Sequence, residues 1–204
     1  MCDAKPAATP MSDSLRISKD DCPEVVDEEA RQEYMEMVGS LLYLGYHTRP
    51  DIAHACSQLG CVLQNPGPLH MAAAKRVIRY IKGTLDLGLI YRAQPWKGPG
   101  LDHPIEASTV VGYTDADWAG CPDSRKSTSC YLTYLAGGPI SWRMNKQKVN
   151  AMSSAESELI AMSGGARDIE YVRNTLVCIG VLKQEKATVL MSDSSAAIAI
   201  ADKS

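Results

Sequence analysis

Five acidic residues in the second half of the chain stand where carboxylates could hold a metal ion: Asp115, Asp117, Glu156, Glu158 and Asp193. The first two interrupt the run GYTDADWAG, which otherwise has the pattern of a buried strand leading into a turn. Burying a carboxylate is costly unless a cation or hydrogen-bond donors compensate it. Mg²⁺ prefers oxygen ligands, and two such ions about 4 Å apart can promote phosphodiester hydrolysis. The acids therefore predict a metal site.

Each of these acids also has a local explanation. Asp117 follows Asp115 by two residues, so it shares the same strand face or already begins the turn. Glu156 lies three residues after a serine, which is the position of the glutamate in a helix capping box, and this leaves Glu158 for chemistry. Asp193 precedes two serines and could be only a helix N-cap.

Alternating and apolar runs predict the strands that position the acids. These strands cover residues 109–119, 127–137, 138–152 and 187–193. The first three are joined by short turns, which is typical of an antiparallel meander. The fourth is apolar enough to be central and parallel, and it should lie beside the first because a strand–helix–strand connection returns there. Asp115 and Asp193 are then expected on neighbouring strands.

A long helix is predicted between the third and fourth strands. It begins with the capping signature of Ser153 and ends at Gly180. Its expected inward face consists of Leu159, Met162, Ala166, Ile169, Val172, Leu176 and Ile179. A further helix follows from residue 194. The predicted fold class is α/β: three antiparallel strands, a helix, a fourth strand parallel to the first, and a helix over a mixed sheet.

The first half of the chain predicts a small helical bundle. Helical spacing runs from about Glu29 to Tyr46, the residues HTRPD break it, and further helices follow at residues 51–64 and 69–82. The run LGLIYR, residues 87–92, is a candidate strand. The expected organisation is a flexible acidic arm at 1–29, a helical segment at 30–92, a linker at 93–108 and an α/β domain at 109–204.

Composition narrows the class of protein. No apolar run among the 204 residues approaches the roughly 18 that a membrane span needs, and no secretory signal is recognisable at the start. The seven cysteines are scattered without a C-x-x-C pair, which favours free thiols in a reducing compartment. We therefore expect an intracellular protein, cytoplasmic or nuclear, with no membrane partner.

Local basic surfaces could bind phosphate even though the net charge is −3. The candidate nucleic-acid-binding residues are Lys75, Arg79, Arg125, Lys126 and Lys146. The alternative is that these charged side chains only form a solvated face of the protein and bind no ligand.

Long motifs in the chain resemble copia-type retrotransposon polyproteins. Residues 112–162, GYTDADWAG through SSAESELIAM, resemble their ribonuclease H domain, and VLMSDSSAAIAIA resembles the third motif of that domain. The runs MVGSLLYLGYHTRPDIAHACSQLG and HMAAAKRVIRYIKGTLDLGLIY resemble the thumb- and connection-like segment between reverse transcriptase and ribonuclease H. The resemblance implies a ribonuclease H-like fold and covers nearly the whole chain.

The resemblance also implies roles for individual residues. The catalytic and metal-ligating acids of the family correspond to Asp115, Glu158 and Asp193, with Asp117 as a neighbour. They would hold two Mg²⁺ or Mn²⁺ ions and cleave the RNA strand of an RNA–DNA hybrid, in association with the reverse transcriptase part of a polyprotein. RNA would be recognised through its 2′-hydroxyls and both strands through their phosphates.

The sequence also departs from the family pattern. Family members continue through another helix, a fifth strand and a closing helix, and supply a fourth acid there, whereas this sequence ends at Ser204. It has no Tyr-x-Asp-Asp polymerase motif, and Cys130 replaces a usual glycine. The expectation is a nuclease domain impaired by truncation. The alternatives are a non-catalytic relic that binds nucleic acid or protein, and the translated product of a pseudogene.

Overall fold

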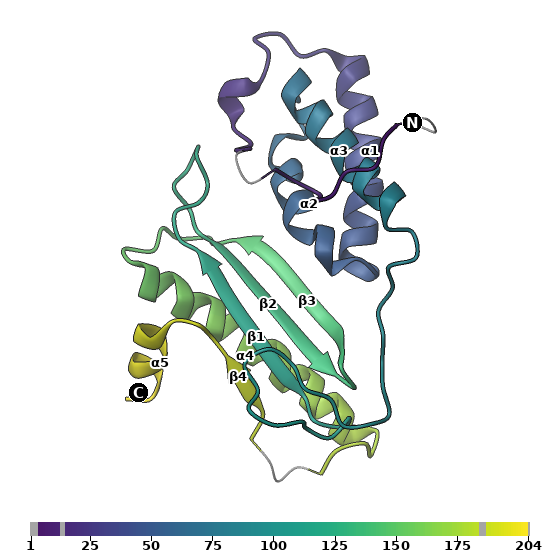
Figure 1. Cartoon of the computed structure of the whole chain (residues 1–204). Helices are drawn as coiled ribbons and strands as arrows, with labels where there is room; N and C mark the ends of the chain where they lie inside the picture. Colours follow the sequence, from purple (N-terminus) through teal and green to yellow (C-terminus); the bar gives the residue numbers. More distant parts are fainter. Residues whose placement is uncertain (1–3, 13–14, 184–186, 204) are drawn as a thin grey trace. The chain divides into compact units, whose positions relative to one another are not determined.

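The computed structural model describes residues 4–12, 15–183 and 187–203. The chain forms two compact units, Met1–Gly88 and Leu89–Ser204. Among the described residues, the regular elements of the first unit are all helices, and the sheet lies in the second unit (Figure 1). The division falls at Gly88 rather than at Arg92 because the next residues pair with the sheet unit: the Arg92 N–H donates to the Ala136 carbonyl (2.7 Å) and the Tyr91 hydroxyl to the Pro139 carbonyl (2.8 Å).

The first unit is a bundle of three α-helices, as predicted. Its elements are η1 (Lys19–Asp21), α1 (Glu28–His47), η2 (Pro50–Ile52), α2 (Ala53–Leu59), η3 (Gly60–Val62) and α3 (Pro68–Gly83). Asp27 caps α1 by accepting from the N–H groups of Glu29 and Ala30, and Pro68 occupies the first turn of α3, where its missing N–H is not needed. The core includes Tyr34, Val38, Ile52, Leu59 and Val77, all fully buried.

The described part of the acidic segment 1–29 packs against this bundle, where a flexible arm is predicted. Ile17 is only 4% exposed, and Met11 and Leu15 pack against the same core. Nearer the start, the Arg79 guanidinium donates to the Lys5 carbonyl (2.6 Å), and the Ala7 N–H donates to the Arg79 carbonyl. Burial of these few apolar side chains explains why a polar segment is ordered here.

A partly buried ion pair closes the loop between α1 and α2. Arg49 is 8% exposed, and its guanidinium donates two hydrogen bonds to the Asp51 carboxylate (2.9 and 2.8 Å). It also donates to the carbonyl and hydroxyl of Thr84, at the end of α3 (3.2 and 2.7 Å). The Tyr80 hydroxyl donates to the same carboxylate (2.8 Å). Arg49 therefore joins this loop to the end of α3.

Replacing Arg49 by Met is expected to destabilise the first unit by about 1–2 kcal/mol, because it leaves the half-buried Asp51 carboxylate without its cation. The matched control is Arg31→Met, which breaks an exposed pair with Glu28 and should change stability by less than about 1 kcal/mol. Urea unfolding of the chain followed by circular dichroism measures both. Equal effects of the two substitutions would contradict the role of Arg49.

The second unit is an α/β fold of the ribonuclease H-like type. Its elements are β1 (Val111–Asp117), β2 (Thr128–Leu135), β3 (Gly138–Lys146), α4 (Ser154–Cys178), β4 (Val189–Met191) and α5 (Ser195–Ala201). The sheet order is β3-β2-β1-β4; β1 pairs antiparallel with β2 and parallel with β4. The predicted fold class and the position of the fourth strand beside the first are thus confirmed.

Two strand predictions differ from the structure. Residues 87–92 form no strand, and β3 ends at Lys146 instead of continuing to Met152. β4 is also short: its pairing with β1 runs only from Val111↔Val189 to Tyr113↔Met191. Beyond Tyr113 and Met191 the two segments of the chain are no longer paired, and Asp115 and Asp193 lie there.

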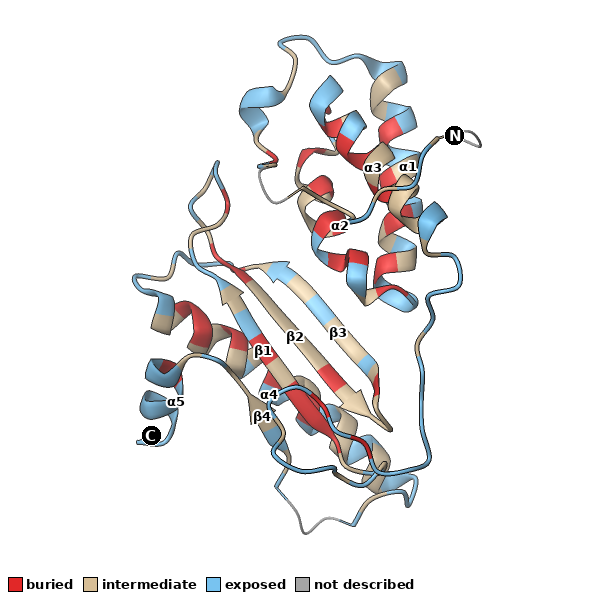
Figure 2. Cartoon of the chain, viewed as in Figure 1, coloured by how far each residue is buried: buried red, intermediate tan, exposed pale blue. Residues whose placement is uncertain are grey.

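Helix α4 packs on one face of the sheet through small residues. Its buried side includes Ala161, Gly165 and Ile169, whereas Ala166, which is predicted to face inward, is exposed. A Cβ at Gly165 would overlap the Thr114 methyl group, so the helix backbone lies directly on β1. Figure 2 shows the buried residues of this unit concentrated on β1, β2 and α4. Close backbone approach, rather than large apolar side chains, fixes the inward face.

The opposite face of the sheet is covered in part by the residues predicted as a linker. Trp96 is 7% exposed, forms an isolated antiparallel bridge with Ile105, and stacks on Tyr134 with 5.7 Å between the ring centroids. The Tyr113 hydroxyl donates to the Pro99 carbonyl (2.9 Å). Segment 93–108 is therefore packed on the sheet at these points, because its Trp and the strand tyrosines bury one another.

Candidate metal centre

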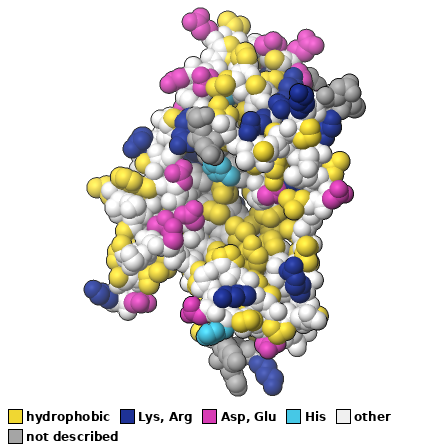
Figure 3. All heavy atoms as spheres, viewed as in Figure 1, with side chains coloured by type: hydrophobic (Ala, Val, Ile, Leu, Met, Phe, Trp, Pro, Cys, Tyr) yellow, Lys and Arg dark blue, Asp and Glu magenta, His cyan; other side chains and the backbone are white. Residues whose placement is uncertain are grey.

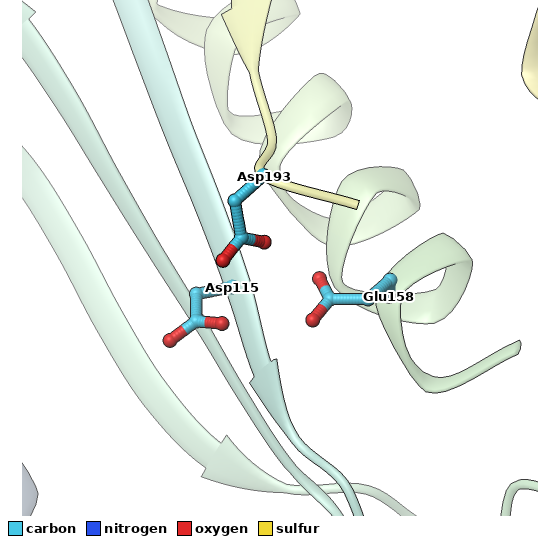
Figure 4. A group of neighbouring side chains, drawn as sticks. All are labelled: Asp115, Glu158 and Asp193. Carbon is cyan, nitrogen blue, oxygen red and sulfur yellow. The ribbon is translucent and has the colours of Figure 1, made fainter. Parts of the chain in front are cut away.

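Three acids from three elements meet at the point where β1 and β4 separate. Asp115 comes from β1, Glu158 from the first turns of α4, and Asp193 from the segment after β4, and Figure 4 shows their carboxylates directed toward one another. One carboxylate oxygen from each lies within 4.8 Å of the others. The sequence-predicted acids are thus close enough for one or two divalent ions to bridge them.

Glu158 is the buried member of the group and is incompletely satisfied. It is 7% exposed, and its Oε1 accepts from the Ala116 N–H (3.2 Å). Among the described residues, its Oε2 is a buried oxygen without a hydrogen-bond partner. Burial raises the pKa of Glu158; the Ala116 N–H opposes this, and the charges of Asp115 and Asp193 add to it. Since buried carboxylates are normally paired, the free oxygen fits a cation ligand.

The remaining two acids of the sequence pattern lie outside the group. Asp117 is exposed, and its carboxylate lies against the Gly120 backbone, in the space that a Cβ there would fill. Glu156 accepts from the Met152 N–H (2.6 Å), one residue before the predicted partner Ser153. Ser153 itself caps α4 as predicted, since its Oγ accepts from the Glu156 N–H (3.2 Å). The two glutamates therefore divide their tasks: Glu156 supports the helix start and Glu158 faces the acids.

Replacing Ser153 by Ala is expected to destabilise the second unit by about 1 kcal/mol, because one N–H at the start of α4 loses its acceptor. Metal affinity should stay unchanged, since Ser153 contributes no ligand. Thermal melting and calorimetric titration with Mn²⁺ measure the two quantities on the same preparation. A loss of metal binding without a change in melting temperature would show that the division between the two glutamates is wrong.

The predicted nucleic-acid-binding residues fall into two groups. Lys75 and Arg79 belong to α3, where Lys and Arg side chains gather on the face in view in Figure 3. Lys75 lies 3.5 Å from the Glu33 carboxylate, and Arg79 is bonded to the N-terminal segment. Both are therefore already engaged within the first unit.

The other group consists of Arg125 and Lys126, in the loop that follows β1, and Lys146, the last residue of β3. Arg125 is exposed, and Lys126 donates to the Lys148 carbonyl (2.8 Å). The Lys146 ammonium donates to the buried Cys121 Sγ (2.9 Å). Burial alone would raise the pKa of Cys121, but hydrogen bonds from Lys146 and Ser124 lower it to about 7. Sequence reasoning did not identify this thiol, because a single cysteine in a turn carries no pattern.

Within the described residues, none of the helices has both the length and the apolar character required to cross a membrane.

Comparison with known proteins identifies the family. No protein-family model matches the chain. It is 38% identical, over an alignment of 207 residues covering 100% of the chain, to the retrovirus-related Pol polyprotein from transposon TNT 1-94 of Nicotiana tabacum. It is 36% identical over 181 residues, 89% of the chain, to the corresponding polyprotein from transposon RE2 of Arabidopsis thaliana. The chain spans only 14% and 11% of the lengths of these two polyproteins.

A shorter relative matches over most of its own length. Secreted RxLR effector protein 161 of Plasmopara viticola is 43% identical over 139 residues, which cover 68% of the chain and 90% of that protein. The similarity to the transposon polyproteins extends over both units and includes the segments that supply the three acids. The chain therefore belongs to the family of copia-type, retrovirus-related Pol polyproteins of transposons, of which it corresponds to a segment.

Proposed function

We propose that the second unit is a ribonuclease H-type domain that hydrolyses the RNA strand of RNA–DNA hybrids in a metal-dependent reaction. Asp115, Glu158 and Asp193 would hold the ions, Mg²⁺ or Mn²⁺. The observation that carries the proposal is the buried Glu158 carboxylate, whose unpartnered Oε2 belongs to a group of three acids with ligand oxygens within 4.8 Å.

A purely structural role explains this group poorly. None of the ion pairs among the described residues involves Asp115, Glu158 or Asp193. Three carboxylates at this separation repel one another, and the buried one loses solvation as well. A fold would not gain stability from such a group without a cation, so its arrangement favours binding over support.

The three acids would have different tasks in the reaction. Glu158 is held in place by α4 and by the Ala116 N–H, so it offers a fixed oxygen. Asp115 and Asp193 are exposed and can be reached by a phosphodiester. Bound divalent ions would supply the positive charge that lowers the pKa of the attacking water and stabilises the departing 3′ oxygen. Cleavage would leave a 5′-phosphate on one product and a 3′-hydroxyl on the other.

The experiment that tests the proposal is cleavage of an end-labelled RNA–DNA hybrid by the purified chain in Mg²⁺, in Mn²⁺ and in EDTA. RNA–RNA and DNA–DNA duplexes of the same sequence serve as controls. Hybrid-specific cleavage that EDTA abolishes is expected. Binding of the hybrid without cleavage in either metal, together with no calorimetric signal for Mn²⁺, would contradict the proposal and favour a non-catalytic module that binds nucleic acid. In the polyprotein, we expect the reverse transcriptase part to deliver the hybrid.

The pH dependence of metal binding follows from the raised pKa of Glu158. A proton and a cation compete for the same carboxylate, so metal affinity should fall as pH decreases, beginning above the usual range for a glutamate carboxyl. Calorimetric titration with Mn²⁺ between about pH 5 and pH 8 measures this. Glu158→Gln should weaken binding and remove this part of the pH dependence. An affinity that stays constant until the usual carboxyl range would contradict the involvement of Glu158.

A further inference from the structure

Trp118 is a half-exposed aromatic side chain in the turn that follows Asp115. It is 48% exposed and follows Asp115 by three residues, so its Cα lies within about 11 Å of that of Asp115. Its indole N–H donates to the Ala151 carbonyl (3.1 Å). The ring is therefore held by a hydrogen bond at one edge while much of its apolar surface remains in solvent.

The segment between β3 and α4, to which Trp118 is hydrogen-bonded, carries further exposed apolar side chains. Val149 is 58% exposed and Met152 is 89% exposed, and both lie in the segment between β3 and α4. Buried tertiary contacts would normally remove such side chains from water, and contiguous apolar patches on a surface often mark binding sites. We call residues 118–126 and 147–152 together the two-loop platform.

Hydrogen bonds between the two loops fix the platform before any ligand binds. Besides the Trp118–Ala151 bond, Lys126 donates to the Lys148 carbonyl (2.8 Å) and the Asn150 amide to the Ser124 carbonyl (3.4 Å). A preorganised surface loses less conformational entropy on binding than a mobile one. The platform is thus suited to position a ligand relative to the acids at the end of β1.

The platform carries three cations, Arg125, Lys126 and Lys148, against one acid, Asp123, and this excess of positive charge favours a polyanion as ligand. Arg125 and Lys148 are exposed. The Arg125 backbone adopts φ 55°, a left-handed conformation that a non-glycine residue rarely takes. Cations that contact phosphates, combined with an aromatic ring on which nucleotides pack, are the two elements of sequence-tolerant nucleic-acid binding. The three acids alone would repel phosphates, so attraction has to come from neighbouring residues.

We propose that Trp118 is a substrate-positioning residue: a sugar ring on the surface of the bound duplex packs its apolar face on the indole while flanking phosphates contact Arg125 and Lys148. The inference rests on the proposed function for the class of ligand, a nucleic-acid strand that continues into the metal centre. It adds a specific surface for that strand, on the side of the acids where β1 ends.

The test is the affinity of the chain for a fluorescent RNA–DNA hybrid, measured by anisotropy in Ca²⁺ so that binding is read without hydrolysis. Trp118→Ala should weaken binding about tenfold, since the apolar face of one sugar ring loses its contact with the indole. Trp118→Phe, which keeps an aromatic face, should recover most of the affinity. The matched control is Tyr171→Ala, which removes an aromatic side chain that is 73% exposed on α4 and should leave affinity unchanged.

Cleavage measurements separate this inference from the proposed function. If the wild-type chain cleaves the hybrid, Trp118→Ala should raise KM more than it lowers kcat. If the chain cleaves but Trp118→Ala binds and cleaves like wild type, the platform is refuted and the nuclease stands. If the chain does not cleave but Trp118→Ala still weakens binding, the platform stands and the nuclease fails. Equal losses in Trp118→Ala and Tyr171→Ala would also overturn the platform.

Discussion

Replacing Asp115 by Asn is expected to reduce metal-dependent cleavage of the hybrid by roughly a thousandfold or more. The substitution keeps the size and shape of the side chain but removes one of the three negative charges that would neutralise the ions. Stabilisation of transition-state charge by a metal is worth several kcal/mol, and each 1.36 kcal/mol changes a rate about tenfold. Initial rates on the labelled hybrid, with Mn²⁺ affinity measured in parallel, give the result.

The control for Asp115→Asn is Asp117→Asn. Both residues lie on β1 and both substitutions are isosteric, but the Asp117 carboxylate lies at the Gly120 turn and outside the group of three acids. Its replacement should change the rate by less than about threefold, since the substitution keeps the size and shape of a side chain that contributes no ligand. Cleavage that survives Asp115→Asn, or that falls equally in both variants, would remove Asp115 from the site.

Replacing Gly165 by Val is expected to destabilise the second unit by about 3 kcal/mol. At this position any Cβ overlaps the methyl group of Thr114, a side chain of β1 that is only 6% exposed. Overpacking of this kind typically costs about 1–3 kcal/mol, and a branched side chain adds further atoms to the same contact. Denaturant unfolding measures the effect on stability.

The same substitution should also weaken metal binding. Glu158 lies two turns before Gly165 on α4, so a helix displaced from the sheet carries Glu158 away from Asp115. The matched comparison is between the substitutions Gly164→Ala and Gly165→Ala. A Cβ at Gly164 meets only Tyr131, at 3.9 Å, so Gly164→Ala should be neutral or stabilising by up to about 1 kcal/mol. Gly165→Ala should be destabilising. If the two alanine variants were equally stable, close packing of the α4 backbone on β1 would not be what holds the helix.

Local patterns were sufficient for the order of elements and for part of the site. The break at Pro50 and the cap at Ser153 follow from residue types whose preferred backbone conformations are local. The place of the fourth strand beside β1 follows from the strand–helix–strand connection. The preference for Glu158 over Glu156 followed in part from the same reasoning, since the capping position accounts for Glu156. Chain connectivity then constrained Asp115 and Asp193 to neighbouring strands.

Which face of α4 is buried, and which side chains stay exposed to solvent, depend on tertiary contacts that the sequence pattern does not contain. Hydrophobic periodicity, which weighs side chains by their apolar character, places Ile169 on the inward face correctly, but it also places Ala166 there, which is exposed, and Leu159 and Met162, which are only half-buried. The actual contact uses Ala161 and Gly165, because close backbone packing depends on the shape of a strand distant in sequence. Such contacts leave no periodic signal along the chain.

Residue types and motifs along the chain are enough to predict the family, the α/β layout and the identity of three acids that could bind metal. Tertiary structure determined that their oxygens meet within 4.8 Å, that Glu158 is buried with one oxygen unpartnered, and that Trp118 is held exposed beside them. The physical reason is that local propensity depends on neighbours in sequence, whereas burial, separation and hydrogen-bond satisfaction depend on residues brought together by folding. The position of Trp118 depends on one bond to Ala151, across 33 residues of chain.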